Sequence, residues 1–184
     1  MQKYVALLRG INVGGNNRVE MPKLKLAFEG LGYKNVKTYI NSGNVIFESD
    51  LDLDKGHLGK SGLEKMVAGI EASLKAKFGF EIKVFVCKFE TLQKICKEIP
   101  KDWQNDDLQK TDILFLWEGY NNKEAIKLIK TNPEVDSLLF SNGAIIWNVK
   151  RADYAKSGMK KFIGTDVYKN MTARNVNTVR KLGE

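Results

Sequence analysis

Residues 38–49 read TYINSGNVIFES, in which two short runs of β-branched and aromatic residues flank the polar turn 41–44. Such runs on either side of a turn rich in Asn and Gly predict a β-hairpin. The pattern recurs a hundred residues later, where the apolar runs 138–140 and 144–147 flank Ser141-Asn142-Gly143. The correspondence between residues 43–47 and 143–147 indicates a degenerate internal duplication.

The segments around the first hairpin predict a regular order of strands and helices. A buried strand is expected at 4–8, and a helix is expected to begin at Pro22 and to end near Gly32. After the hairpin, Ser61 and Glu64 have capping-box spacing at the start of an apolar helical stripe that runs to residue 78. A strand at 82–87 and a helix from Phe89 to the residue before Pro100 come next.

The second hairpin has similar neighbours. We expect a strand at 112–117, a helix at 123–130, and two C-terminal helices at 154–163 and 172–182. This order predicts an α+β fold of two ferredoxin-like halves of the βαββα type, each an antiparallel sheet with helices on one face, plus C-terminal helices. The predicted boundaries are residues 1–88 for the first half, 89–107 for a linker helix and 108–184 for the second, degenerate half.

The composition is that of an ordinary globular protein, with 43% hydrophobic and 28% charged residues. Cys87 and Cys96 lack the CxxC spacing of redox or zinc sites, so we expect free thiols. No apolar run approaches the roughly 20 residues of a membrane-spanning helix, and Met1 leads directly into a strand-like run. A cytoplasmic protein with no membrane partner, no metal and no cofactor is expected.

The net charge of +8 is concentrated toward the two ends of the chain. Residues 1–50 carry seven cations against four acids, and residues 150–184 carry nine against three. If the ends share a surface, that surface is basic and suits phosphates, nucleic acid or an acidic partner. Solubility is an equally good explanation of the charge.

A glycine-rich loop, residues 10–18, separates the first predicted strand from the first predicted helix. Glycines allow successive N–H groups to point into one concavity, and a helix N-terminus adds partial positive charge, so such loops bind anions. Arg9 and Arg18 can supply forked donors. The loop equally suits left-handed turns that need Gly and Asn. Gly10, Gly14 and Gly15 do not have the GxGxxG spacing. Gly59-Lys60-Ser61 does not complete a P-loop either, because Asp54 stands where that pattern needs its first glycine.

Other polar residues have two interpretations each. In the first hairpin, Asn41, Ser42 and Asn44 can reach a ligand or bond their own backbone. His57 is expected at the surface, and the aspartates at 50, 52 and 54 are expected in a solvated loop because they lack the glycine and glutamate of an EF-hand. In a helix over 172–182, one polar face would hold Arg174, Asn177, Thr178 and Lys181.

Three stretches of the sequence resemble a bacterial family known as domain of unknown function 1697: LLRGINVGGNNRVEM at 7–21, TYINSGNVIFES, and MTARNVNTVRKL at 171–182. The resemblance implies a duplicated ferredoxin-like α+β fold and no established activity. This chain has Val176 where the family has Trp. The residues that match the family pattern are Arg9, Gly10, Asn12, Gly14, Gly15, Tyr39, Ser42, Gly43, Asn44, Thr172, Arg174, Asn175, Asn177 and Thr178.

Three functional hypotheses remain open, and the sequence does not decide whether the protein is an enzyme or what its oligomeric state is. The first is binding of a phosphate-bearing or other anionic ligand, nucleotide or nucleic acid, between the glycine-rich loop and the C-terminal helix. The second is an acylphosphatase-like hydrolase, because Gly10, Gly14 and Arg18 match GxVQGVxxR although Val13 replaces its glutamine. The third is a structural or protein-interaction module. The candidate ligand-binding residues are Arg9, Gly10, Asn12, Gly14, Gly15, Asn17, Arg18, Asn41, Ser42, Asn44, Arg174, Asn175, Asn177 and Thr178.

Overall fold

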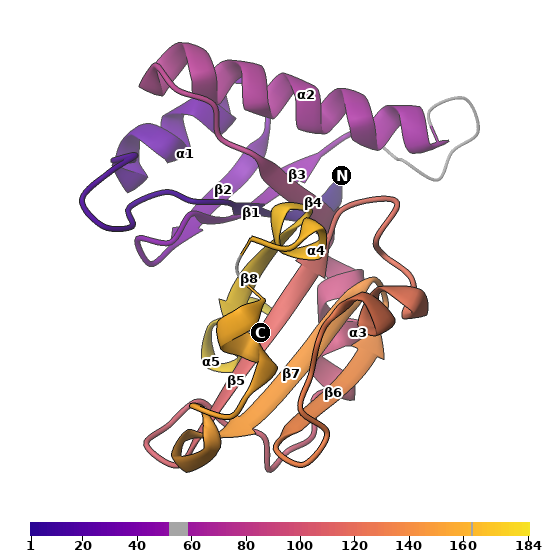
Figure 1. Cartoon of the computed structure of the whole chain (residues 1–184). Coiled ribbons are helices and arrows are strands. Elements are labelled where there is room, and N and C mark those ends of the chain that lie inside the picture. The colour runs from indigo at the N-terminus through magenta and orange to yellow at the C-terminus, as the bar shows by residue number, and fades with distance from the viewer. Residues whose placement is uncertain (52–58, 163) are drawn as a thin grey trace. The chain divides into compact units, whose positions relative to one another are not determined.

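The computed structural model describes residues 1–51, 59–162 and 164–184. The chain forms two compact units, Met1–Glu90 and Thr91–Glu184, and each contains one four-stranded antiparallel sheet (Figure 1). The strand orders, β2-β3-β1-β4 and β6-β7-β5-β8, are the same order when strands are numbered within each unit. The predicted α+β class and two-half architecture are confirmed.

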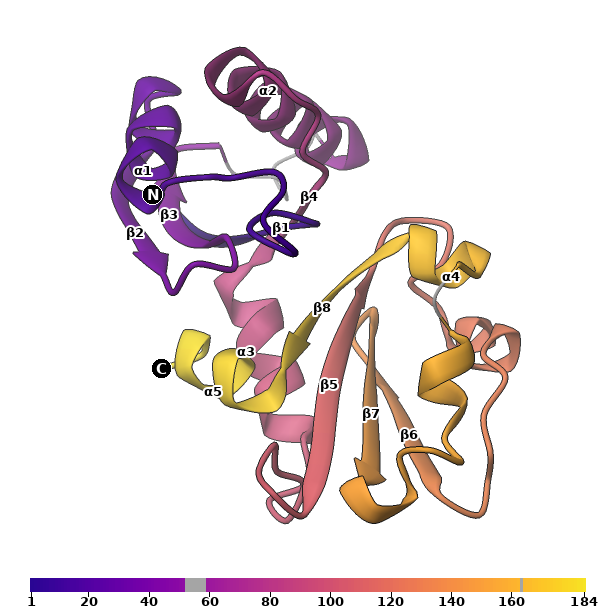
Figure 2. The same cartoon turned by 60° about the vertical axis from the view of Figure 1, so that its left-hand side comes forward.

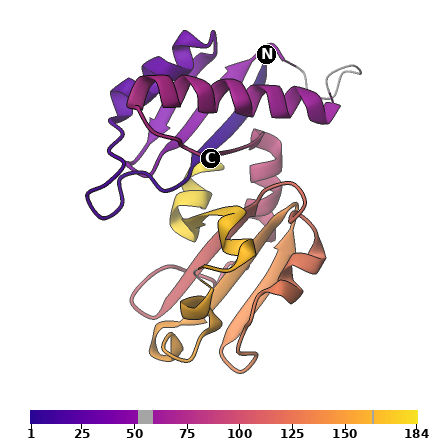
Figure 3. The same ribbon diagram turned by 45° about the horizontal axis from the view of Figure 1, so that its top comes forward.

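The first unit has the ferredoxin-like order βαββαβ. Its elements are β1 (Gln2–Leu8), α1 (Met21–Gly30), β2 (Lys34–Tyr39), β3 (Asn44–Ser49), α2 (Gly59–Phe78) and β4 (Val84–Lys88). Strand β1 pairs with both β3 and β4, and β2 forms the edge beyond β3. Both helices cover one face of the sheet (Figures 1 and 3). The core lies there, because alternate residues such as Tyr4, Ala6 and Leu8 pack with Phe28 of α1 and Ile70 of α2.

The predicted elements of the first unit are present, with one correction at a boundary. Helix α1 has Pro22 in its first turn, and Gly32, with φ +86°, lies just past its end and donates its N–H to Glu29 O at 2.9 Å. Helix α2 begins at Gly59. The prediction that Ser61 caps this helix is therefore wrong, because the two preceding residues already have helical backbone.

The second unit repeats the strand arrangement with much shorter helices on one side. Figure 2 shows α3 and α5 on one face of the sheet and the short helices on the other. Leu114 and Trp147 pack with Phe162 and Val167 on the latter face, while Phe115 points the other way and is fully buried. The elements are α3 (Phe89–Glu98), β5 (Gln109–Leu116), the 3-10 helix η1 (Lys123–Leu128), β6 (Asp136–Ser141), β7 (Ala144–Lys150), the 3-10 turns η2 (Arg151–Asp153) and η3 (Gly158–Lys161), α4 (Asp166–Lys169), β8 (Met171–Asn175) and α5 (Val176–Leu182).

Three predicted helices of this unit are wrong in part. The helix expected at 123–130 is a 3-10 helix that ends at Leu128, since Ile129 already has extended backbone. The helix expected at 154–163 is replaced by short 3-10 turns, and Ile163 lies outside the described residues. A continuous helix does not form because Gly158 packs directly against the backbone of Lys130 and the Ser157 hydroxyl accepts the N–H of Met159.

The third is the helix expected at 172–182, of which only Val176–Leu182 is helical. Residues Met171–Asn175 form β8, which pairs antiparallel with β5 and occupies the sheet position that β4 has in the first unit. The helical period of Val176, Val179 and Leu182 is real, yet it does not extend upstream, because pairing with a distant strand overrides local propensity.

Candidate functional site

An open hollow of about 660 Å³ lies beside the glycine-rich loop of the first unit. Its lining includes the predicted site residues Asn12, Gly15, Arg18 and Asn41. The sequence interpretation missed five further lining residues, whose only signal was their place in the loop or at the start of the first helix: Asn16, Val19, Glu20, Met21 and Pro22. We call this set of nine residues the glycine-loop hollow.

The glycine-rich loop beside the hollow has five residues in left-handed conformation, of which Asn12 and Gly15 line the hollow itself. Gly10, Gly14 and Gly15 have φ of +68°, +61° and +80°, and Asn12 and Asn17 have φ of +55° and +54°. A β-carbon is disfavoured at such angles, and Asn tolerates them better than other residues with a side chain. The prediction that this loop needs Gly and Asn for left-handed turns is confirmed.

The Asn12 side chain fixes the two walls of the hollow to each other. Its Oδ1 accepts the N–H of Val19 at 2.8 Å, and its Nδ2 donates to Val19 O at 2.9 Å and to Asn41 O at 2.8 Å. The first two bonds close the loop onto the start of α1, and the third joins the loop to the hairpin between β2 and β3. Asn12 therefore holds the shape of the hollow through its amide.

Three other predicted site residues make hydrogen bonds within the loop and the hairpin. Asn17 Nδ2 donates to Gly10 O at 3.0 Å. Asn44 is fully buried, and its Nδ2 donates to Tyr39 O and to Ser42 Oγ, both at 2.9 Å. These bonds support the backbone that Asn41 and Gly15 present to the hollow.

The hollow combines a cation with the N-terminus of a helix. Arg18 is exposed, and its guanidinium makes no hydrogen bond or ion pair with the described part of the chain. No side chain caps α1, and its first turn has no acidic residue. Because Pro22 has no N–H and Leu24 N–H donates to Glu20 O at 2.9 Å, the N–H groups at this helix start that can face a ligand are those of Met21 and Lys23. The carboxylate of Glu20 accepts a hydrogen bond from Lys23 Nζ at 2.9 Å. This bond and the charge of Lys23, with a smaller contribution from Arg18, lower the pKa of the Glu20 carboxyl.

Arg9 comes directly after β1 and is half-buried. Its N–H donates to Lys83 O at 2.9 Å, and it does not line the glycine-loop hollow. Of the other predicted loop residues, Gly10 and Gly14 shape the chain without lining the hollow.

The four predicted C-terminal site residues lie in the second unit. Arg174 is on β8 and only 8% exposed, and it donates to Ala173 O at 2.7 Å and Thr172 Oγ1 at 3.1 Å. Burial lowers the pKa of its guanidinium to about 10. The predicted helix face that grouped Arg174 with Asn177, Thr178 and Lys181 is wrong, because Arg174 precedes the helix in an extended strand.

The remaining C-terminal residues hold α5 in place. Asn175 caps the helix by accepting the N–H of Thr178 at 2.9 Å, Thr178 itself is buried, and Asn177 Nδ2 donates to Asn105 O at 3.0 Å. That these residues share a ligand with the glycine-rich loop stays a prediction.

Within the described residues, no group of three or more His, Cys, Asp and Glu side chains is placed to hold a metal ion. Asp52, Asp54 and His57 lie outside those residues. Cys87 and Cys96 are free thiols, and burial raises the pKa of Cys96, whose thiol donates to Val179 O at 3.3 Å. No helix in the described ranges is both long and apolar enough to cross a membrane.

Comparison with known proteins identifies a family and a similar structure. A family model described as "Protein of unknown function (DUF1697)" matches residues 1–146. The structure of the conserved bacterial protein SP0830 from Streptococcus pneumoniae is similar with a TM-score of 0.79 and 28% identity, over 99% of this chain and 97% of that one. Among curated proteins, none matches the chain significantly.

Proposed function

The chain belongs to the DUF1697 family of proteins of unknown function, and from that premise we propose that its glycine-loop hollow binds a phosphate-bearing ligand, a nucleotide or nucleic acid. The observation that carries the proposal is the meeting of Arg18 with the uncapped N-terminus of α1 in one open hollow. A guanidinium fork and helix N–H groups are both donors that suit phosphate oxygens.

The size and lining of the hollow favour a ligand larger than inorganic phosphate. Its volume of about 660 Å³ is typical of small-molecule sites. Asn16, Arg18 and Asn41 provide polar groups, while Met21 and Pro22 provide apolar surface. A phosphate beside Arg18 with a sugar or base over the apolar residues would use both kinds of lining.

Substitution of Arg18 tests the proposal. We expect adenosine monophosphate to bind wild type saturably in calorimetry, and Arg18→Ala to weaken binding by roughly 10- to 100-fold, the value of a charge-assisted hydrogen bond. Arg18→Lys should restore part of the loss, since lysine keeps the charge but not the fork. Lys65→Ala, which removes an exposed cation from α2, is the matched control and should bind as wild type does. Equal affinity of wild type and Arg18→Ala would contradict the proposal.

We also propose that the C-terminal segment of the second unit contributes to nucleotide binding. Asn177 is its most accessible predicted site residue, since Arg174 and Thr178 are buried. Asn177→Ala should therefore weaken nucleotide binding. Unchanged affinity would restrict the site to the glycine-loop hollow.

Acylphosphatase-like hydrolysis is a second candidate, because Arg18 and Asn41 line one hollow of a βαββαβ unit. In this reaction water adds to phosphorus while the phosphorus–oxygen bond to the acyl group breaks, which releases carboxylate and phosphate. Arg18 would hold the phosphoryl oxygens and Asn41 the water. Benzoyl phosphate turnover that Arg18→Ala abolishes would support the candidate, and absence of turnover by folded wild type would remove it.

A further inference from the structure

The segment 150–161 of the second unit carries a concentrated positive charge. Its five cations oppose a single acid, Asp153, so twelve residues contribute +4 to a chain whose total is +8. The cations are Lys150, Arg151, Lys156, Lys160 and Lys161. We call this segment, together with the neighbouring Lys130, the basic turn cluster.

The segment folds back on itself through successive turns, which bring the Lys160 ammonium to the Tyr154 ring. Successive turns join Tyr154 N–H to Arg151 O at 3.2 Å and Ser157 N–H to Tyr154 O at 3.3 Å. Lys160 Nζ lies 5.8 Å from the centroid of the Tyr154 ring, which brings η3 to the end of η2. Lys130 borders the cluster, because a β-carbon on Gly158 would overlap its carbonyl oxygen.

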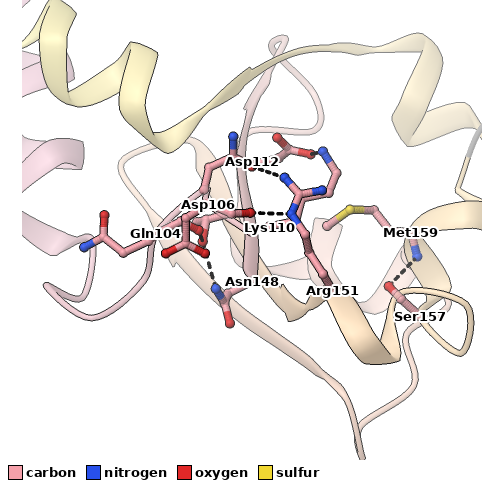
Figure 4. A network of polar contacts seen from close by, with 10 residues as sticks. Gln104, Asp106, Lys110, Asp112, Asn148, Arg151, Ser157 and Met159 are labelled. Atoms are coloured by element: carbon pink, nitrogen blue, oxygen red, sulfur yellow. Dashed lines mark hydrogen bonds and ion pairs between the residues drawn. The ribbon is translucent and has the colours of Figure 1, made fainter. Parts of the chain in front are cut away.

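Two of these cations are already used within the unit. Arg151 donates from Nε to Asp106 O and from a terminal nitrogen to Asn105 Oδ1 at 3.5 Å (Figure 4). Lys156 pairs with Asp153 at 3.1 Å. Lys130, Lys150, Lys160 and Lys161 are exposed and make no ion pair with any described residue. Four ammonium groups therefore face solvent without a counter-ion from the described chain.

We propose that the basic turn cluster binds the phosphate backbone of double-stranded nucleic acid, independently of sequence. Closely spaced lysines match a polyanion, because each phosphate contact releases a condensed counter-ion. No large apolar side chain of the described segment is exposed, since Met159 and Phe162 pack into the core, so a bilayer would find no anchor. No exposed aromatic ring is present there for stacking with single-stranded bases either.

Fluorescence anisotropy with a labelled 20-base-pair duplex of arbitrary sequence tests this surface. With about four phosphate contacts, affinity should fall roughly 150-fold between 50 and 200 mM salt. The triple variant K150Q/K160Q/K161Q should weaken binding at 50 mM salt by at least tenfold and lower the salt slope by roughly 2.7. The matched control K34Q/K65Q/K77Q removes equal charge from exposed positions of the first unit and should keep the full slope.

The outcomes separate this proposal from the one for the glycine-loop hollow. K150Q/K160Q/K161Q should leave the affinity for adenosine monophosphate unchanged, because none of these three lysines lines the glycine-loop hollow. Salt-insensitive binding, no binding at 50 mM salt, or equal losses in the two triple variants would overturn the proposal. Binding of phosphatidylserine vesicles but not of the duplex, with the same lysine dependence, would overturn it in favour of a membrane surface.

Discussion

The two units share one contact between the first strand and the hairpin, but they differ in the segment that leaves that strand. Leu8 N–H donates to Gly43 O at 2.8 Å in the first unit, and Leu116 N–H donates to Gly143 O at 3.2 Å in the second. In the first unit residues 9–20, which include the glycine-rich loop, connect β1 to α1, whereas residues 117–122 suffice between β5 and η1 in the second. The longer connection of the first unit forms the glycine-loop hollow, so of the two duplicated units it is the first that carries the candidate site.

The units also differ in how their sheets are covered. In the first, apolar stripes of α1 and α2 pack on the sheet. In the second unit, short turns cover the corresponding face of the sheet. The buried carboxylate of Asp136 holds these turns, because it accepts hydrogen bonds from Trp147 Nε1 at 3.0 Å, Gly158 N at 2.9 Å, Asn132 N at 2.8 Å and the Ser157 hydroxyl. Burial raises the pKa of this carboxyl, but the donated hydrogen bonds outweigh burial and leave it lowered. A polar anchor thus replaces helix packing.

Removing that anchor should have the largest effect on stability. Asp136→Ala leaves four donors without their acceptor, and we expect the free energy of unfolding to fall by about 3 to 5 kcal/mol. Urea denaturation followed by Trp fluorescence measures the change. Asp153→Ala, which removes only a surface ion pair with Lys156, is the control and should cost about 0.5 kcal/mol or less. Similar losses in both variants would contradict the anchor.

The equivalent hairpin glycines should respond unequally to alanine. At Gly43, with φ +72°, a β-carbon would lie 2.6 Å from Ile11 Cδ1 and 2.8 Å from Leu8 Cβ. At Gly143, with φ +83°, the nearest atom would be Asn121 Cβ at 3.4 Å. We therefore expect Gly43→Ala to destabilise by about 2 to 4 kcal/mol and Gly143→Ala by about 1 kcal/mol. Equal costs in thermal or urea unfolding would show that the loop does not press on the first hairpin.

Acidic pH should lower the free energy of unfolding through protonation of the Asp136 carboxylate. The folded pKa of Asp136 lies below its ordinary value, so its stabilisation is complete above the ordinary value near 4 and is lost as pH falls through the folded pKa. The free energy of unfolding should therefore fall more steeply below pH 4 in wild type than in Asp136→Asn. Parallel pH profiles from urea titrations would contradict the lowered pKa.

The smallest effect concerns backbone strain in the first hairpin. Ile40 is half-exposed and has φ +47°, a left-handed angle that disfavours β-branched side chains, while the second hairpin has Asn142 at the same angle. Ile40→Asn should stabilise the protein by about 1 kcal/mol, and Asn142→Ile should destabilise it by about as much. Melting temperatures that move in the same direction for both variants would contradict this account.

Much of the fold can be predicted from local patterns in the sequence. Both hairpins, helices α1 to α3 and the duplicated order were predictable because each depends on apolar period, turn residues and proline. Strand β8 was not, because its conformation is set by pairing with β5. Nor was the Asp136 anchor, since a single aspartate next to apolar residues gives no sign of donors that lie up to 22 residues away.

The candidate site shows the same limit. The glycine-rich loop was identified from composition, and Arg18, Asn12 and Asn41 do line one hollow. The sequence did not distinguish Asn12, which fixes the walls with its amide, from Arg18, whose guanidinium is available. Hydrogen bonds between segments decide such roles, and they appear only once the chain is folded.

The most direct test of the claim that only the first unit carries this site is an amide NMR titration of the isotope-labelled protein with adenosine monophosphate. We predict saturable shifts for residues 12–21 and 41, no comparable shifts for residues 117–122, and saturation of the shifts at roughly 10- to 100-fold higher nucleotide concentration in Arg18→Ala. Shifts confined to the second unit, or none at millimolar nucleotide, would contradict the account.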